Sequence, residues 1–410
     1  MKHIIILGDG MSDEPIDSLG GKTPLACAKT PTLDTISKKS RLGLVNTIPS
    51  GMSPGSDTAN LSVLGFDPRK YYSGRSPLEA LNIGAPMVDG DIALRLNLVT
   101  ISEEKIPFSE QTIIDHSSGE ISTEEADVLL KAVKKELAFY IEENRFAIYT
   151  GTSYRHCLIW SDGKVLDFVA PHDVLGQQIS EYLPANPVFH TMMLRSFEIL
   201  RYHPINIKRR KSGKNPANCF WFWGAGTKPS LPSFEEKTGK KGIMISAVDL
   251  LKGIGKACGM SVPMIPGANG TLHTNYAGKV DAAMNALLND GYDFAYVHIE
   301  APDEMSHQGD LANKIKAIEY LDEKVITPVF DRLTESGEDF RLLVMPDHPT
   351  PLRLRTHTAD SVPFMLYDST LSYYDNTVNL SHDGYYNEAT CQATGDLIES
   401  GYLLIEELFN

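Results

Sequence analysis

The first ten residues, MKHIIILGDG, hold the pattern that decides the fold: the apolar run Ile4-Ile5-Ile6-Leu7 leads directly into Gly8-Asp9-Gly10. Similar apolar runs occur at 219–223 (CFWFW), 294–299 (FAYVHI) and 342–345 (LLVM). Continuous rather than alternating hydrophobicity predicts strands that are covered on both faces, as in a parallel sheet between helices. Helical patterns lie between these runs, at 282–289 and 315–333. The sequence therefore predicts an α/β fold, with a core sheet sandwiched by helices.

The middle of the chain has a different pattern of predicted strands and helices. It contains a strand-like run ALRLNLVTI, an acidic helix that opens at residues 122–125 (STEE), and a strand-like pair at 145–149 and 156–160. The basic segment 208–214 (KRRKSGK) is expected to be an exposed linker or hinge. A chain of 410 residues is also longer than a usual single domain. Two domains are therefore expected.

Composition excludes several classes of protein. Acidic residues outnumber basic ones by 53 to 38, and the net charge of -15 argues against a nucleic-acid binder or an anionic-membrane binder. No apolar stretch is long enough for a signal peptide or a membrane-spanning helix. The cysteines are odd in number and scattered, which argues against disulfides or a cysteine zinc site and favours the cytoplasm. They are Cys27, Cys157, Cys219, Cys258 and Cys391.

Acidic and histidine residues follow the strand-like runs. They are Asp9 in GDGM, Asp303 and His307 in APDEMSH, Asp347 and His348 in PDH, and His357 in RTHTADSVPF. Side chains that follow parallel strands converge at one edge of the sheet. Singly, each residue is more often a helix cap or a structural histidine. As a set of carboxylates and imidazoles they predict a metal site that suits Zn²⁺ or Mn²⁺ better than Ca²⁺.

Ser56, in the small-residue loop PGSDTAN, is the candidate nucleophile. A serine at a helix N-terminus lies in a positive local field, and a metal on its oxygen would activate it further. The alternative is a plain N-cap serine. Other nucleotide and hydrolase motifs fail: GGKT lacks the preceding glycine of a phosphate-binding loop, and the dinucleotide glycine spacing is missed by one residue at 253–259. GMSPG matches a hydrolase elbow only in letters, since Pro54 has no N–H to donate.

These residues and their surroundings resemble the alkaline phosphatase superfamily, and within it the archaeal-type 2,3-bisphosphoglycerate-independent phosphoglycerate mutases. The resemblance covers nearly the whole length. Its motifs are GDGM, LGGKTPLACAKTPTLD (19–34), PGSDTANLSVLGFDP (54–68), YYSGRSPLEAL (71–81), ISTEEA (121–126), HPIN (203–206), LPSFEEKTGKKG (231–242), DLLKGIG (249–255), APDEMSHQGD (301–310), and PDHPTP followed by HTADSVPF.

The resemblance implies a metal-binding core of residues 1–75 and 216–410, interrupted by a smaller α+β domain, 76–215, that closes over the substrate. It implies that Ser56 is phosphorylated during turnover. It also implies two divalent metal ions, with Mn²⁺ or Zn²⁺ favoured and Mg²⁺ as a further candidate. Asp9, Ser56, Asp347 and His348 would hold one ion, and Asp303, His307 and His357 the other.

A small phosphorylated substrate needs cations from the protein. The candidates are Arg75 and Lys252 on the core side, and Arg155, His156 and His172 from the insert. For any one of them the alternative is a surface salt bridge.

The sequence departs from the archaeal pattern at two places, where PGSDTAN stands for PGSDTAH and GRSPLEA for GRGPFEA. The bacterial branch with these variants includes proposed homoserine kinases. The main prediction is interconversion of 3-phosphoglycerate and 2-phosphoglycerate. The alternatives are a homoserine kinase or another phosphotransferase on the same core, a metal-dependent phosphatase, and a non-catalytic metal-binding protein. The sequence leaves the oligomeric state open.

Overall fold

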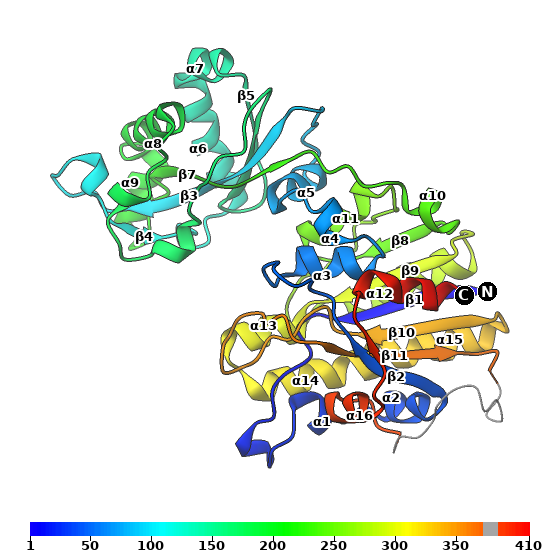
Figure 1. Ribbon diagram of the computed structural model, residues 1–410. Helices are drawn as coiled ribbons and strands as arrows, with labels where there is room; N and C mark the ends of the chain where they lie inside the picture. Colours follow the sequence, from blue (N-terminus) through cyan, green and yellow to red (C-terminus); the bar gives the residue numbers. More distant parts are fainter. Residues whose placement is uncertain (372–383) are drawn as a thin grey trace. The chain divides into compact units, whose positions relative to one another are not determined.

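The computed structural model describes residues 1–371 and 384–410, and the chain divides into two compact units (Figure 1). The first unit comprises Met1–Tyr72 and Ser230–Asn410, and the second unit comprises Ser73–Pro229. In sequence, the second unit is therefore an insertion in the first. Each unit has its own sheet.

The first unit is built on a seven-stranded mixed sheet. In spatial order its strands are β12 (Leu397–Ile398), β2 (Ser40–Val45), β11 (Val362–Asp368), β10 (Phe340–Met345), β1 (Lys2–Gly8), β9 (Phe294–Ile299) and β8 (Gly242–Ile245). The central strands β10, β1, β9 and β8 are parallel to one another, and β11 is antiparallel to both β10 and β2. The predicted parallel core is confirmed in these central strands.

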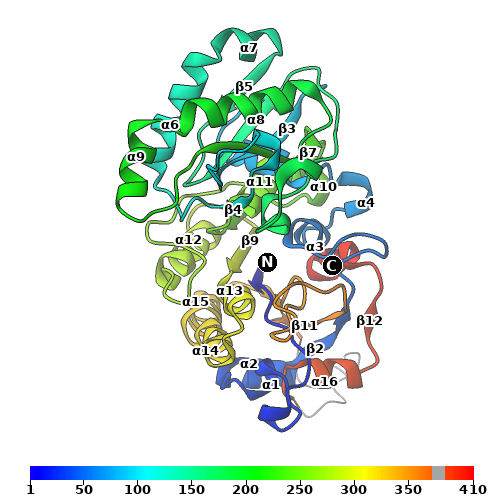
Figure 2. The same cartoon turned by 90° about the vertical axis from the view of Figure 1, so that its left-hand side faces the viewer.

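Helices cover both faces of this sheet. One face packs on α12 (Tyr276–Leu288), α14 (Leu311–Leu321) and α15 (Thr327–Ser336), which Figure 2 shows stacked along one side of the sheet. Aromatic contacts place α10 (Phe234–Thr238) and α17 (Leu404–Phe409) on the other face. Residues 4–7 are fully buried because alternate side chains enter the two layers. The remaining helices are α1 (Pro24–Cys27), α2 (Pro31–Ile36), α3 (Ser56–Val63), α4 (Pro68–Tyr71), α11 (Asp249–Ala257), α13 (Ala301–Gln308) and α16 (Glu388–Ala393).

The helix predicted over 315–333 contains an irregular turn. A π-helical segment, Asp322–Ile326, joins α14 to α15. The buried carboxylate of Asp322 accepts hydrogen bonds from the backbone N–H groups of Thr32 and Leu33, at 3.2 and 2.8 Å. The π-helical turn therefore places the Asp322 carboxylate where it accepts from the free N–H groups at the start of α2.

The second unit is an antiparallel sheet with helices. Its strands are β3 (Ile92–Ile101), β4 (Ile113–Asp115), β5 (Phe146–Tyr149), β6 (Arg155–Trp160) and β7 (Cys219–Thr227). Its helices are α5 (Arg75–Asn82), α6 (Thr123–Glu136), α7 (Ala138–Glu143), α8 (Pro187–Leu200) and α9 (Pro204–Lys211). Apolar side chains from β3, β7, α6 and α8 form its core. The predicted combination of an α/β core with an inserted α+β unit is confirmed.

Two details of the sequence interpretation are wrong. The run at 219–223 does not join the core sheet, because β7 pairs antiparallel with β3, and the second unit consequently extends past the expected residue 215. The basic segment is not a linker: most of it ends helix α9. There Arg209 is buried, pairs with Glu125 at 2.5 Å and donates to the carbonyl of Asn215.

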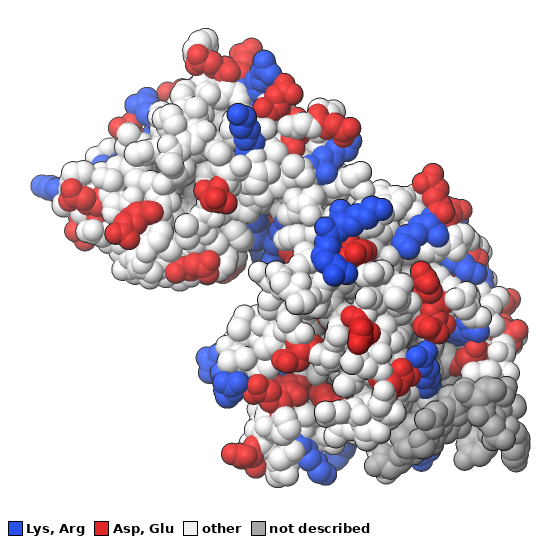
Figure 3. Space-filling model, viewed as in Figure 1, with Lys and Arg blue, Asp and Glu red and all other residues white. Residues whose placement is uncertain are grey.

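On the face shown in Figure 3, acidic side chains lie among the basic ones over both units. Among the residues that the structure describes, no helix combines the length and hydropathy needed to cross a membrane.

Candidate metal centre

The ends of the parallel strands bring the first set of predicted ligands together. Asp9 directly follows β1, and Asp347 and His348 follow β10. All three side chains are buried, and their ligand atoms lie within 4.8 Å of one another. Nε2 of His348 is 3.3 Å from Oδ2 of Asp347 and 3.6 Å from Oδ1 of Asp9. We call these three residues the aspartate-rich group.

Asp303, His307 and His357 form a second set, the histidine-rich group, whose ligand atoms also lie within 4.8 Å of one another. Asp303 and His307 are one turn apart on α13, which begins just after β9. Nε2 of His307 is 3.1 Å from Oδ2 of Asp303 and 3.1 Å from Nε2 of His357. The rings of His357 and His348 stack with centroids 3.9 Å apart, so the two groups are adjacent.

Ser56 lies beside the aspartate-rich group. It is the first residue of α3, and its Oγ is 3.1 Å from Nε2 of His348. Asn60, one turn further along α3, donates to the carbonyl of Ser56 at 2.7 Å and to Oδ2 of Asp347 at 2.9 Å. Asn60 is the position at which the chain departs from PGSDTAH. The structure therefore gathers all seven predicted ligand and nucleophile residues in the first unit.

The electrostatics of this centre favour a cation. Burial, and then the negative charges of Asp347, Asp303 and Glu300, raise the pKa of Asp9 well above its usual range. Burial would also raise the pKa of Asp303, but hydrogen bonds from His307 and His357 hold it well below its usual range. The hydrogen bond to Asp303 raises the pKa of His307 to about 9. Positive charge is thus stabilised beside these crowded carboxylates.

The donor set fits divalent metal ions. Oδ1 of Asp9 is inaccessible to solvent and accepts no hydrogen bond from the residues that the structure describes. An unpartnered buried carboxylate oxygen is costly unless a cation binds it. Mixed carboxylate and imidazole ligands suit Zn²⁺ and Mn²⁺.

His298 is a site residue that the sequence analysis missed. It lies inside β9, fully buried, with Nε2 2.9 Å from Oδ2 of Asp9 and Nδ1 3.2 Å from Oγ of Ser246. Oγ of Ser246 accepts from the N–H of Val248, so its proton is available to Nδ1, and Nε2–H donates to Asp9. Burial lowers the pKa of His298 to about 3, which keeps the ring neutral. The hydrogen bond occupies one oxygen of Asp9 and leaves the other for a metal.

Several predicted substrate cations lie in the second unit. Arg75 begins α5, which places it outside the expected core segment, and its Nε pairs with Glu79 at 3.0 Å. The guanidinium of Arg155 lies over the ring of Tyr154, and the half-exposed His172 packs edge-on against Trp223. Arg95 is a further cation, which no sequence motif indicated; it pairs with Glu79 at 2.5 Å and stacks on Trp223 at 4.5 Å.

These cations influence one another. Burial lowers the pKa of Arg95 against the opposing charge of Glu79, and the positive charges of Arg75 and Arg155 lower it further. Burial, and then the charges of His116, Arg95 and Arg75, lower the pKa of His172 against the opposing effect of Asp173. Arg75, Arg95 and Arg155 thus repel one another, and the carboxylate of Glu79 offsets part of their charge.

The other two candidates differ in character. His156 is buried in β6, its Nδ1 accepts from the N–H of Gly151 at 3.1 Å, and burial lowers its pKa to about 3. We therefore withdraw it as a substrate ligand, because it offers neither charge nor accessible surface. Lys252 lies on α11 in the first unit, with Nζ 3.5 Å from Oδ1 of Asp249.

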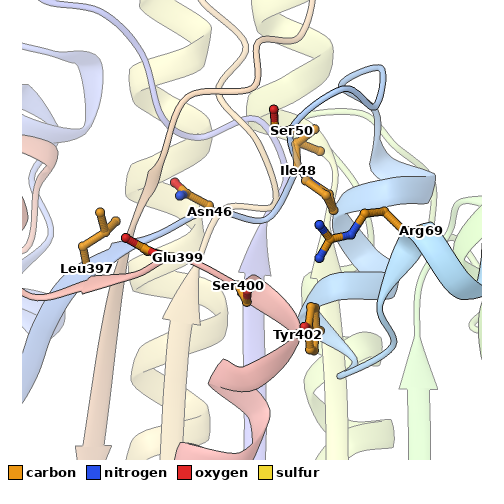
Figure 4. Close-up of a pocket in the computed structure, with 10 residues that line it drawn as sticks. Asn46, Ile48, Ser50, Arg69, Leu397, Glu399, Ser400 and Tyr402 are labelled. Carbon is orange, nitrogen blue, oxygen red and sulfur yellow. The ribbon is translucent and has the colours of Figure 1, made fainter.

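A cavity of about 290 Å³ lies elsewhere in the first unit, beside the loop that precedes Ser56 (Figure 4). Asn46, Ser50, Arg69, Glu399 and Tyr402 line it together with Ile48, Pro49, Leu397, Ser400 and Gly401. Because its described lining includes neither ligand group, this cavity is not the metal centre.

Comparison with known proteins identifies the family. A family model for 2,3-bisphosphoglycerate-independent phosphoglycerate mutase matches residues 37–206. A probable mutase of that name from Geobacter sulfurreducens is 43% identical over 100% of both chains, and one from Methanosarcina barkeri is 42% identical over 98% of each.

Solved structures agree with the fold. A protein from Pyrococcus horikoshii has a TM-score of 0.77 at 27% identity, covering 99% of this chain and 96% of that one. The cofactor-independent phosphoglycerate mutase of Thermoplasma acidophilum has a TM-score of 0.62 at 26% identity, covering 100% of this chain and 99% of that one. The chain belongs to the 2,3-bisphosphoglycerate-independent phosphoglycerate mutase family.

Proposed function

We propose that this protein interconverts 3-phosphoglycerate and 2-phosphoglycerate through a phosphoserine at Ser56. The observation that carries the proposal is the position of the Ser56 hydroxyl, 3.1 Å from His348, beside two adjacent groups of metal-ligating side chains. Full-length similarity to proteins named as this mutase supports the same substrates.

Two divalent ions would be bound, one by the aspartate-rich group with Ser56 and the other by the histidine-rich group. We favour Mn²⁺ or Zn²⁺, with Mg²⁺ as a further candidate. When bound, such ions stabilise negative charge on a transferring phosphoryl group and lower the pKa of a nearby hydroxyl.

The chain's own residues would perform the transfer in two balanced halves. Oγ of Ser56 attacks phosphorus, the bond from phosphorus to the 3-oxygen of the substrate breaks, and the hydroxyl proton passes to that oxygen. After the glycerate reorients, its 2-oxygen attacks the phosphoserine, the bond from phosphorus to Oγ of Ser56 breaks, and the proton of the 2-hydroxyl passes to Oγ. No water, nucleotide or bisphosphate is consumed. The side-chain N–H groups of Asn60 and His298 hold the Ser56 carbonyl and the Asp347 and Asp9 carboxylates in place throughout.

The glycerate must be retained while it turns. We assign this task to the positive charges of the second unit, Arg75, Arg95, Arg155 and His172, and to Lys252 of the first. The second unit would close over the substrate, excluding the water that would hydrolyse the phosphoserine. The five cysteines are free thiols, which suits the reducing cytoplasm in which we place the reaction.

The test uses the purified full chain loaded with Mn²⁺. It receives 3-phosphoglycerate alone or, separately, ATP with homoserine. We expect 2-phosphoglycerate in the first reaction and no ADP release that depends on homoserine in the second. Ser56→Ala should abolish turnover with an unchanged circular dichroism spectrum, whereas the matched control Ser53→Ala, in the exposed part of the same loop, should retain it. Homoserine-dependent ADP release without 2-phosphoglycerate formation would reject the proposal.

A further inference from the structure

Thr350 lies between the two ligand groups. Its side chain is fully buried two residues after His348. The hydroxyl Oγ1 is 2.6 Å from Oδ1 of Asp303, in the histidine-rich group, and 3.2 Å from Nδ1 of His348, in the aspartate-rich group. A single hydroxyl therefore touches one predicted ligand of each metal ion.

The hydrogen-bond donors and acceptors of Thr350, Asp303 and His348 determine which atom carries each proton. A threonine hydroxyl has one proton to donate, and an ionised carboxylate can only accept. The proton of Thr350 therefore goes to Asp303, and its oxygen accepts from Nδ1–H of His348. A neutral imidazole has only one N–H, so Nε2 of His348 carries the lone pair. That nitrogen faces Oγ of Ser56 and the carboxylates of the aspartate-rich group, as metal ligation requires.

The surroundings hold this hydroxyl in place. The buried ammonium of Lys314 donates to the carbonyl of Thr350 at 3.0 Å, and the N–H of Thr350 donates to the carbonyl of Ser12 at 3.2 Å. Gly10 packs directly against the pair: a Cβ there would lie 2.6 Å from Oγ1 of Thr350 and 2.5 Å from Oδ1 of Asp303. Two hydrogen bonds therefore hold the backbone of Thr350, and Gly10 closes one side of its hydroxyl.

We propose that Thr350 is a positioning residue that fixes the His348 tautomer and the orientation of Asp303, and thereby couples the two metal sites. The inference rests on the proposed two-metal chemistry and deepens it. Because one hydroxyl serves both groups, its loss weakens binding of both ions rather than one.

The experiment compares Thr350→Val, which removes the hydroxyl at similar volume, with Thr350→Ser, which keeps it. Mn²⁺ binding to the full chain is measured by equilibrium dialysis. We expect Thr350→Val to weaken both sites about 10- to 100-fold, as loss of a hydrogen bond to a metal ligand commonly does. Thr350→Ser should restore wild-type affinity. Wild-type affinity in Thr350→Val, or equal loss in both variants, would overturn the inference.

A second measurement does not need the metal. In metal-free protein with ¹⁵N-labelled histidine, the signal that disappears in His348→Asn reports the tautomer of His348. We expect the proton on Nδ1 in wild type and in Thr350→Ser, and a loss of that preference in Thr350→Val. Thr350→Ala serves as the hydroxyl-free variant if Thr350→Val does not fold.

A proton on Nε2 in the wild type would overturn the assignment. Failure of the proposed function would look different: 3-phosphoglycerate would remain unconverted while metal binding and the tautomer followed these expectations.

Discussion

Replacing Lys314 by methionine should strongly destabilise the first unit. Nζ of Lys314 donates to Oδ2 of Asp13 at 2.7 Å and to the carbonyls of Ser12 and Thr350 at 3.3 and 3.0 Å. The side chains of Lys314 and Asp13 are 0% and 2% exposed. Lys314→Met leaves the Asp13 carboxylate buried without its counter-charge, in the loop that follows Asp9.

The size of the effect follows from the burial of the pair. Removing one partner of a buried ion pair costs about 3–5 kcal/mol. We therefore expect Lys314→Met to lose about 4 kcal/mol of unfolding free energy at pH 7.

Urea unfolding followed by circular dichroism at pH 7 measures this loss. The double variant Asp13→Asn/Lys314→Met removes the stranded charge, so it should recover much of the stability that Lys314→Met loses. A loss below about 1 kcal/mol at pH 7, the size of a surface substitution, would contradict this expectation. A double variant no more stable than Lys314→Met would refute it as well.

Three further predictions follow from other contacts. Gly10 has φ +59 and packs on Asp303 and Thr350, so Gly10→Ala should lose both stability and Mn²⁺ affinity. Gly20 has φ +67 and open space around it, so the control Gly20→Ala should lose only the backbone cost of about 1–2 kcal/mol of stability. Urea unfolding measures the stability and dialysis the Mn²⁺ affinity. Equal effects of the two substitutions on both quantities would contradict the role of packing at Gly10. Burial lowers the pKa of His3 to about 4, below its unfolded value near 6.5, so the unfolded chain takes up the proton first and stability falls as pH drops through that window. Between pH 7 and pH 5, the free energy of unfolding of His3→Leu should therefore fall by about 2 kcal/mol less than that of the wild type, measured by urea unfolding. Equal falls in the two proteins would contradict this. Chelation by EDTA should lower the melting temperature, and Mn²⁺ at 100 times its dissociation constant should restore about 2.7 kcal/mol per independent site; an unchanged melting temperature would argue against a metal site.

The core of the fold could be predicted from the sequence because a strand that is buried on both faces has a continuous apolar run. Strands β1, β9 and β10 are apolar at nearly every position, since helices cover each side. The predicted place in the core sheet is wrong for β7, although its run CFWFW is just as apolar. An apolar run reports that a strand is buried, but not which strand lies beside it, and β7 pairs with β3 in the other unit.

The candidate site was predictable where side chains follow strand ends. Asp9, Asp347 and His348 were found in this way, and they lie together. His298 was missed because it lies within a strand, where a single histidine resembles a core residue. Of the neighbouring candidates Arg155 and His156 only Arg155 is exposed, because neighbouring residues of a strand face opposite sides. Thr350 carries no charge, so only its distances to Asp303 and His348 identify it.

The most direct test of the central claim is to look for the phosphoryl group on Ser56. Mn²⁺-loaded protein is mixed with 3-phosphoglycerate labelled in its phosphoryl group, quenched in acid within a single turnover, and digested for mass spectrometry. The account predicts that the labelled phosphoryl group appears on the peptide that carries Ser56, that labelled 2-phosphoglycerate follows, and that Ser56→Ala shows neither. Formation of 2-phosphoglycerate without any phosphoryl group on Ser56 would contradict the account.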